Sequence, residues 1–115
     1  MRRGEIRLVD LDPARGNEAN KLRPAIIVSN DRANAAASRS QRGVVTVVPV
    51  TSNVSRVYPF QVLIPGPACG LRVDSKAQAE QVRSVSVDRL GNPLGYVPAD
   101  VMEQVDAALR LHLGL

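Results

Sequence analysis

The sequence is poor in the residue types on which most metal and redox sites depend. Its 115 residues include one cysteine and one histidine, which are Cys69 and His112. A single cysteine cannot form an intrachain disulfide or build a cysteine-based zinc or iron–sulfur site. A single histidine excludes a catalytic histidine pair within one chain. The sequence therefore predicts no cofactor and no metal, and we expect a structural role for His112.

Long apolar runs and aromatic side chains are scarce as well. No apolar stretch approaches the roughly 18 residues that cross a bilayer, and Glu5, Arg7 and Asp10 interrupt the segment in which a signal peptide needs an apolar core. We therefore expect a cytoplasmic protein with no membrane partner. Aromatic residues make up only 3% of the chain, which argues against binding single-stranded nucleic acid mainly by stacking.

Positive charge, in contrast, is in excess and is carried mostly by arginine. The chain has 15 Lys and Arg against 11 Asp and Glu, for a net charge of +4, and its only lysines are Lys21 and Lys76. The guanidinium group binds phosphate and carboxylate through two parallel hydrogen bonds, so this bias favours a polyanionic partner. An ordinary basic surface is the alternative.

The apolar pattern predicts one domain over residues 1–115 that is mainly β, with a C-terminal helix. β-Branched and alternating runs predict strands over 6–11, 24–28, 44–50, 60–64, 71–75 and, with a bend, 79–87, followed by a turn at 91–93 and a short extended segment at 94–97. The alanine-rich segment 31–42 suits a short helix or a flexible connection. A helix is expected to begin at Pro98 and to end at Gly114. Five to seven short strands and one amphipathic helix predict a small, strongly curved barrel.

Arg23 is the most informative candidate for a functional residue. Pro24 forces it into an extended conformation, and it follows a charged loop that contains Glu18 and Lys21. A guanidinium at a strand edge is suited to bind an anion. If strand 24–28 pairs with strand 44–50, Arg23 and Thr51 could face one phosphate. The alternative is a salt bridge from Arg23 to Glu18 that stabilises only the loop.

These residue types suit RNA cleavage by the RNA's own 2′-hydroxyl group. That reaction needs alignment of the hydroxyl with phosphorus, stabilisation of the phosphorane charge and two proton transfers, but no nucleophile from the enzyme. Arginine and hydroxyl donors can stabilise the phosphorane. Side-chain amides suit hydrogen-bonded recognition of a short sequence, although each is also an ordinary loop or strand-end residue; they are Asn17, Asn30, Gln78 and Gln81.

Four segments, in order along the chain, resemble the MazF/PemK toxin family. They are GEI…VDLDP…GNE…RPAIIVS (4–29), VPVTS (48–52), YPFQV (58–62) and AEQVRS (79–84). The resemblance implies an SH3-like barrel of the CcdB/PemK kind and a homodimer. It also implies a toxin that cleaves single-stranded RNA, expected to be messenger RNA, at specific sequences without a metal. The implied products are a 2′,3′-cyclic phosphate and a 5′-hydroxyl, and the implied inhibitor is a MazE-like antitoxin whose C-terminal segment fills the RNA groove.

The resemblance implies roles for particular residues. Arg23 and Thr51 match the catalytic pair, and Glu18 matches a third residue important for activity in some members. Because a guanidinium is a poor proton acceptor at neutral pH, we expect Arg23 to stabilise the phosphorane and Thr51 to hydrogen-bond the phosphate. The general base is then Glu18, a water or an RNA group. The expected RNA-binding residues are Asn17, Lys21, Asn30, Ser52, Lys76, Gln78, Glu80 and Gln81.

A second function is compatible with the same barrel. Gyrase-poisoning toxins share it, bind a protein and cleave nothing, and their inhibitory surface lies on the C-terminal helix. In this chain that surface would lie at 112–115, whereas the distinctive polar residues lie at Arg23 and Thr51. The chain also departs from the family at Arg7, where most members have an aromatic residue, and we expect this to alter packing at the dimer or groove edge.

Overall fold

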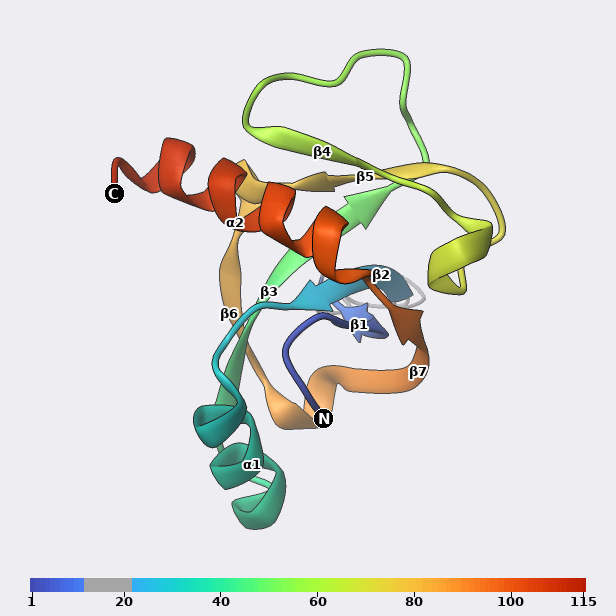
Figure 1. Ribbon diagram of the computed structural model, residues 1–115. Helices are drawn as coiled ribbons and strands as arrows, with labels where there is room; N and C mark the ends of the chain where they lie inside the picture. The colour runs from blue at the N-terminus through green and yellow to red at the C-terminus, as the bar shows by residue number, and fades with distance from the viewer. Residues whose placement is uncertain (12–21) are drawn as a thin grey trace, which may run out of the picture.

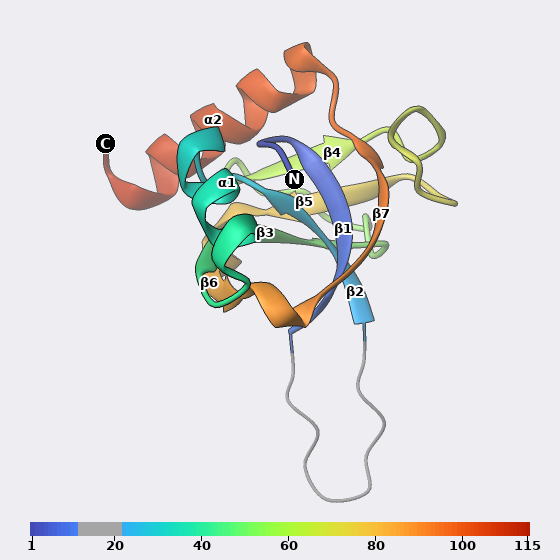
Figure 2. The ribbon, with the colours of Figure 1, turned by 90° about the horizontal axis from the view of Figure 1, so that it is seen from below.

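Seven antiparallel strands curl into one sheet that carries a helix at each of two sides (Figures 1 and 2). The computed structural model describes residues 1–11 and 22–115. The strands are β1 (Glu5–Asp10), β2 (Leu22–Ile27), β3 (Val44–Thr51), β4 (Gln61–Ile64), β5 (Ser75–Gln78), β6 (Arg83–Ser86) and β7 (Leu90–Tyr96). The α-helices are α1 (Asp31–Ser40) and α2 (Ala99–Leu113), and single 3₁₀ turns are η1 (Pro67–Cys69), η2 (Ala79–Gln81) and η3 (Val87–Arg89). The expected β-rich barrel with a C-terminal helix is confirmed.

Strand β3 connects the two parts of the sheet. The strand order is β4-β5-β3-β2-β1-β7, and β6 pairs with β3 beside β5. β3 pairs with β6 as far as Val47 and with β5 from Val50 onward. Pro49, which has no N–H to donate, lies where the partner on that edge changes, so the proline is tolerated within a central strand.

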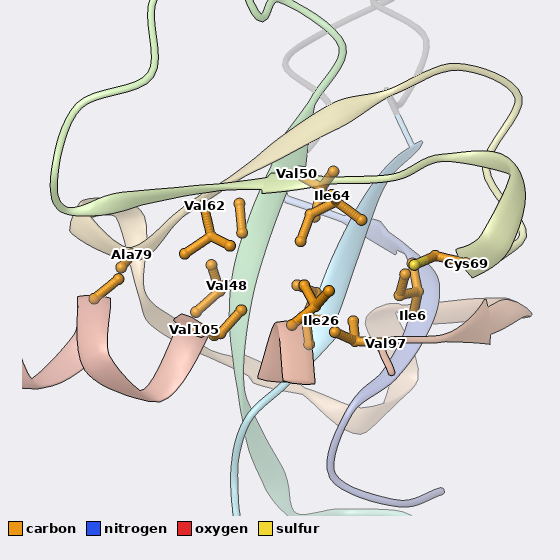
Figure 3. Packing of buried hydrophobic residues seen from close by; sticks show 13 residues of the cluster. Ile6, Ile26, Val48, Val50, Val62, Ile64, Cys69, Ala79, Val97 and Val105 are labelled. Carbon is orange, nitrogen blue, oxygen red and sulfur yellow. The ribbon is translucent and has the colours of Figure 1, made fainter. Parts of the chain in front are cut away.

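The core has two clusters of apolar side chains. The larger lies between the sheet and α2, where Val105 of the helix packs near Val48 and Val62 (Figure 3). The smaller is built on Val9, Ile27 and Val47 and includes Ala37 of α1. Each helix therefore closes one apolar region.

Both helices have clear start and stop signals. Asn30 caps α1 by accepting a hydrogen bond from the Ala33 N–H at 2.8 Å, which decides for a helix over a flexible connection. α2 buries Val101, Val105 and Ala108 and ends at Gly114, whose φ is 72°. The helix predicted after Pro98 is thus confirmed. No helix among the described residues is long and apolar enough to cross a membrane.

Three local predictions differ from the structure. Strand 71–75 is absent: η1 ends at Cys69 and β5 begins only at Ser75. The segment 79–87, expected as a strand with a bend, begins with η2, and its strand is limited to β6. The turn expected at 91–93 lies instead within β7, which pairs with β1 across a register shift, because pairing with β1 outweighs the local turn preference of Gly91-Asn92-Pro93.

Arg7 takes part in a polar cluster around the buried Glu5 on β1 and β7. Its Nη1 lies 2.8 Å from Oε1 of Glu5, and its Nε donates to the Gly91 carbonyl oxygen at 3.0 Å. The Tyr96 hydroxyl donates to the other Glu5 oxygen at 2.9 Å. The Glu5 side chain is only 7% exposed. Arg7 is therefore neutralised inside this chain, and it holds the β1–β7 edge together.

Candidate functional site

The ends of β2 and β3 bring Arg23 and Thr51 to one pocket. β2 pairs with β3 through Ala25–Pro49, Ile26–Val48 and Ile27–Val47, which confirms the pairing expected from the sequence. Continuing this register by two residues places Arg23 level with Thr51. Arg23 is exposed and Thr51 is half-buried, so both can reach a ligand from solvent.

The pocket beside these residues has a volume of about 500 Å³. Its apolar part comes from β1, β2, β3, β7 and the segment after η1. Its polar part consists of two arginines and three hydroxyl residues. The lining residues are Leu8, Arg23, Pro24, Val50, Thr51, Ser52, Gly70, Leu71, Arg72, Val73, Ser75 and Leu94. No carboxylate is among these described lining residues, so the pocket favours an anion with an apolar body.

The Thr51 hydroxyl is oriented by the chain that follows it. Its Oγ1 accepts a hydrogen bond from the Asn53 N–H at 3.3 Å. With this acceptor site occupied by an N–H, the hydroxyl proton is available for donation to a ligand. Ser52 is exposed and lines the same pocket. Arg23, Thr51 and Ser52 thus offer donors, as phosphate binding requires.

Lys76 lies next to Thr51 but faces a different segment. The two residues are direct partners in the β3–β5 ladder. Lys76 is only 8% exposed, and its Nζ donates to the Arg56 carbonyl oxygen at 2.5 Å. It is not among the described residues that line the pocket. Its ammonium group therefore holds the loop between β3 and β4 (residues 52–60) over β5.

Gln78, Glu80 and Gln81 lie beyond Lys76, at the far end of β5 and in η2, and none of them lines the pocket. Gln78 is the ladder partner of Gln61, and the Gln61 side-chain amide donates to Oε2 of Glu80 at 2.8 Å. Oε1 of Glu80 is buried and has no hydrogen-bond partner among the described residues. Gln81 is exposed. These residues are separate from the Arg23–Thr51 group.

Of the four remaining predicted site residues, the structure describes one, Asn30. Asn30 follows the opposite end of β2 from Arg23 and uses its side chain to cap α1, so the structure does not bring it to the pocket. Asn17, Glu18 and Lys21 lie outside the described residues. The proposed salt bridge from Arg23 to Glu18 lies outside them for the same reason.

Sequence reasoning missed Arg72 as a pocket residue, together with its neighbours Leu71 and Ser75. The segment after η1 was assigned to a strand, and its position against β7 depends on contacts distant in sequence. The run Pro65-Gly66-Pro67 and Gly70 could have marked an irregular segment there. Cys69, the last residue of η1, is buried just before this segment. Burial raises the pKa of its thiol, and the nearby charge of Asp100 raises the pKa by a smaller amount.

Comparison with known proteins agrees with this geometry. A family model described as PemK-like, MazF-like toxin of type II toxin–antitoxin system matches residues 2–113. The chain therefore belongs to the PemK/MazF-like toxin family. Within the residues that the structure describes, no group of three or more His, Cys, Asp or Glu side chains is arranged to hold a metal ion.

The matches to individual relatives cover the whole chain. The chain is 64% identical over 115 residues to endoribonuclease MazF9 of Mycobacterium tuberculosis H37Rv, covering 100% of this chain and 98% of the relative. A mycobacterial endoribonuclease solved with its cognate antitoxin matches at a TM-score of 0.79 and 28% identity, covering 100% of this chain and 96% of that one. A MazE–MazF structure from Deinococcus radiodurans matches at a TM-score of 0.79 and 27% identity, with the same coverage.

Proposed function

We propose that this chain is the toxin of a type II toxin–antitoxin system and acts as a metal-independent endoribonuclease on single-stranded RNA. The observation that carries the proposal is the meeting of Arg23 and Thr51 at one pocket without a carboxylate among its described lining. The full-length match to an endoribonuclease at 64% identity supports it. Messenger RNA is the proposed target and the cytoplasm the proposed location, since translating messages are found there.

In the proposed reaction the RNA supplies its own nucleophile. The 2′-oxygen attacks the adjacent phosphorus, the bond from phosphorus to the 5′-oxygen breaks, and the products are a 2′,3′-cyclic phosphate and a 5′-hydroxyl. Arg23 stabilises the extra negative charge of the phosphorane and donates a proton toward the leaving oxygen. Thr51 donates a hydrogen bond to a phosphate oxygen. Glu18 is the proposed general base that takes the 2′-hydroxyl proton.

The proposed partners follow from the same relatives. One neighbouring structure is an endoribonuclease in complex with its cognate antitoxin, and we propose that a MazE-like antitoxin covers the pocket of this chain through its C-terminal segment. An acidic segment would complement the guanidinium groups of Arg23 and Arg72. We also propose a homodimer, as in the family that the chain resembles. Binding of RNA and of antitoxin would then exclude each other.

Gyrase poisoning is the second candidate, and the relatives named above weigh against it because they are endoribonucleases or MazF proteins. It makes a different prediction for two variants. A gyrase poison would keep its toxicity with Arg23→Ala and lose it on truncation of residues 112–115. The proposed nuclease would lose toxicity with Arg23→Ala and keep cleavage activity after the truncation.

The experiment that tests the proposal is cleavage of a long, unstructured RNA in excess EDTA. Cut sites are mapped by primer extension, and product ends are identified by their response to phosphatase and kinase. We expect cuts at one short recurring sequence with cyclic phosphate and 5′-hydroxyl ends. A folded, antitoxin-free protein that makes no cuts would refute the proposal.

A further inference from the structure

We infer that the pocket beside Arg23 and Thr51 binds the nucleobase of a nucleotide next to the scissile phosphate, an inference that rests on the proposed nuclease activity. The pocket is therefore a recognition site and not only the surroundings of the catalytic groups. Its wall residues Leu71 and Arg72, which the sequence analysis did not select, then help determine which RNA is cut.

The chemistry of the lining selects this occupant. Six apolar side chains form one part of the pocket: Leu8, Pro24, Val50, Leu71, Val73 and Leu94. A free phosphate would gain nothing from these apolar surfaces, whereas a planar base loses water-exposed area against them. A metal cation would be repelled by two guanidinium groups. An anion that carries a flat, mostly apolar body satisfies both parts of the pocket, and a nucleotide is such a ligand.

The two guanidinium groups fit an internal nucleotide of an RNA chain better than they fit a free nucleotide. Arg23 and Arg72 are both exposed, and both line this pocket. Every internal nucleotide is flanked by two phosphates, and guanidinium groups bind phosphate through two hydrogen bonds. We assign the scissile phosphate to Arg23, beside Thr51, and the phosphate on the other side of the bound nucleotide to Arg72.

The wall that carries Leu71 and Arg72 is held in place before any ligand binds. A Cβ at Gly70, whose φ is 82°, would overlap the Leu94 carbonyl oxygen, and a Cβ at Gly66 would overlap the Val73 carbonyl oxygen. The Leu71 N–H donates to the Gly66 carbonyl oxygen at 2.8 Å, and the Gly66 N–H donates to the Asp74 carboxylate at 3.0 Å. A wall fixed by backbone contacts can discriminate among bases by shape.

The test pairs an altered RNA with an altered pocket. At the mapped cleavage sequence, each base flanking the cut is replaced in turn by an abasic nucleotide, and kcat/KM is measured for the wild type and for Leu71→Ala. Leu63→Ala is the matched control, because Leu63 is 50% exposed on β4 and does not line the pocket. Circular dichroism melts verify that each variant is folded, and Arg72→Ala, at an exposed position, gives a second pocket variant.

The expected result is that one abasic position costs the wild type at least about tenfold in kcat/KM, as loss of apolar contacts in a pocket does. The same abasic RNA costs Leu71→Ala less than about threefold, because the contact is already lost. Leu63→Ala retains the wild-type loss. Arg72→Ala raises KM and leaves the identity of the sensitive base unchanged.

Three results would overturn the inference. Equal losses in Leu71→Ala and wild type at every position would show that no base depends on this wall. If Leu71→Ala left the RNA kinetics unchanged but weakened inhibition by an antitoxin peptide, the pocket would be a binding site for a protein segment. If Leu71→Ala sedimented as a monomer with normal base dependence, the pocket would be a contact with a second copy of this chain. A wild-type protein that cuts no RNA would overturn the proposed function as well, whereas the first three results leave the cleavage activity itself intact.

Discussion

Arg7 and Arg23 lie on neighbouring strands, β1 and β2, yet their guanidinium groups meet different surroundings. Arg7 contacts the buried Glu5 carboxylate and the Gly91 carbonyl oxygen. Arg23 is exposed at a pocket whose described lining contains a second arginine and hydroxyl groups but no carboxylate. Among the described residues, one arginine therefore stabilises an edge of the sheet through a carboxylate, and the other lies at a pocket whose described lining holds no carboxylate.

The largest effect on stability is expected from breaking the Arg7 cluster. Arg7→Met leaves the buried Glu5 charge with only Tyr96 as a partner, so we expect the free energy of unfolding to fall by about 3 kcal/mol. Urea unfolding monitored by circular dichroism measures it. The double variant Glu5→Gln with Arg7→Met should recover most of the loss, because no buried charge remains. If Arg7→Met kept full stability and lost RNA cleavage, the comparison between the two arginines would be wrong.

The next effect concerns the hydroxyl group opposite Arg23. Thr51→Val keeps the shape and the β-branched side chain but removes the donor, and a hydrogen bond to a charged group contributes about 1.5–3 kcal/mol. We expect the cleavage rate to fall roughly 10–100-fold with little change in melting temperature. Thr51→Ser, which restores a hydroxyl, should regain most of the rate. A full rate for Thr51→Val would remove Thr51 from the site.

A smaller effect is expected at Lys76. This residue lies beside the pocket, and we expect it to act through the 52–60 loop and not on the phosphate itself. Lys76→Met removes the hydrogen bond to the Arg56 carbonyl oxygen and frees the 52–60 loop, at a cost of about 1 kcal/mol. Steady-state kinetics should show KM raised a few-fold and kcat nearly unchanged. A loss in kcat comparable to that of Thr51→Val would instead place the ammonium group on the reacting phosphate.

The smallest effect is expected at Cys69, on the buried side of the pocket wall. Burial raises the pKa of its thiol, so the thiolate population at neutral pH lies below that of an exposed cysteine. We expect iodoacetamide to modify the native protein far more slowly than the urea-unfolded protein, as mass spectrometry would show. Rapid labelling of the folded protein would mean that the wall opens, and a preformed base pocket would then be untenable.

The sequence predicted the meeting of Arg23 and Thr51 better than the rest of the pocket lining, for a physical reason. The apolar runs at 24–28 and 44–50 each specify a strand, and their pairing alone brings Arg23 to Thr51. The segment that carries Arg72 is positioned partly by the close approach of Gly70 to Leu94, a contact between distant residues that no local pattern encodes. The apolar residues of 71–75 favoured a strand, but the contact between Gly70 and Leu94 positions this segment differently.

Two other local contacts had signals in the sequence. Asn30 precedes a helical segment and has the side chain favoured at a helix N-cap. The expected contact of Asn30 with RNA and the expected effect of Arg7 at a dimer or groove edge stay predictions. Glu5 lies two residues before Arg7 and so on the same face of a strand. That spacing predicts an ion pair within the chain, as the structure has it.

If Arg23 acts on the transition state of RNA cleavage, removing its side chain must slow the bond-breaking step itself, which single-turnover cleavage at saturating protein measures. Wild type, Arg23→Ala and Arg39→Ala are compared on one RNA in EDTA, with Arg39, an exposed arginine of α1, as the matched loss of charge. We predict that Arg23→Ala slows the bond-breaking step at least about hundredfold, as removal of a transition-state donor does, and that Arg39→Ala matches wild type. Cleavage by Arg23→Ala at the wild-type rate, or equal losses in both variants, would show that Arg23 does not act on the transition state.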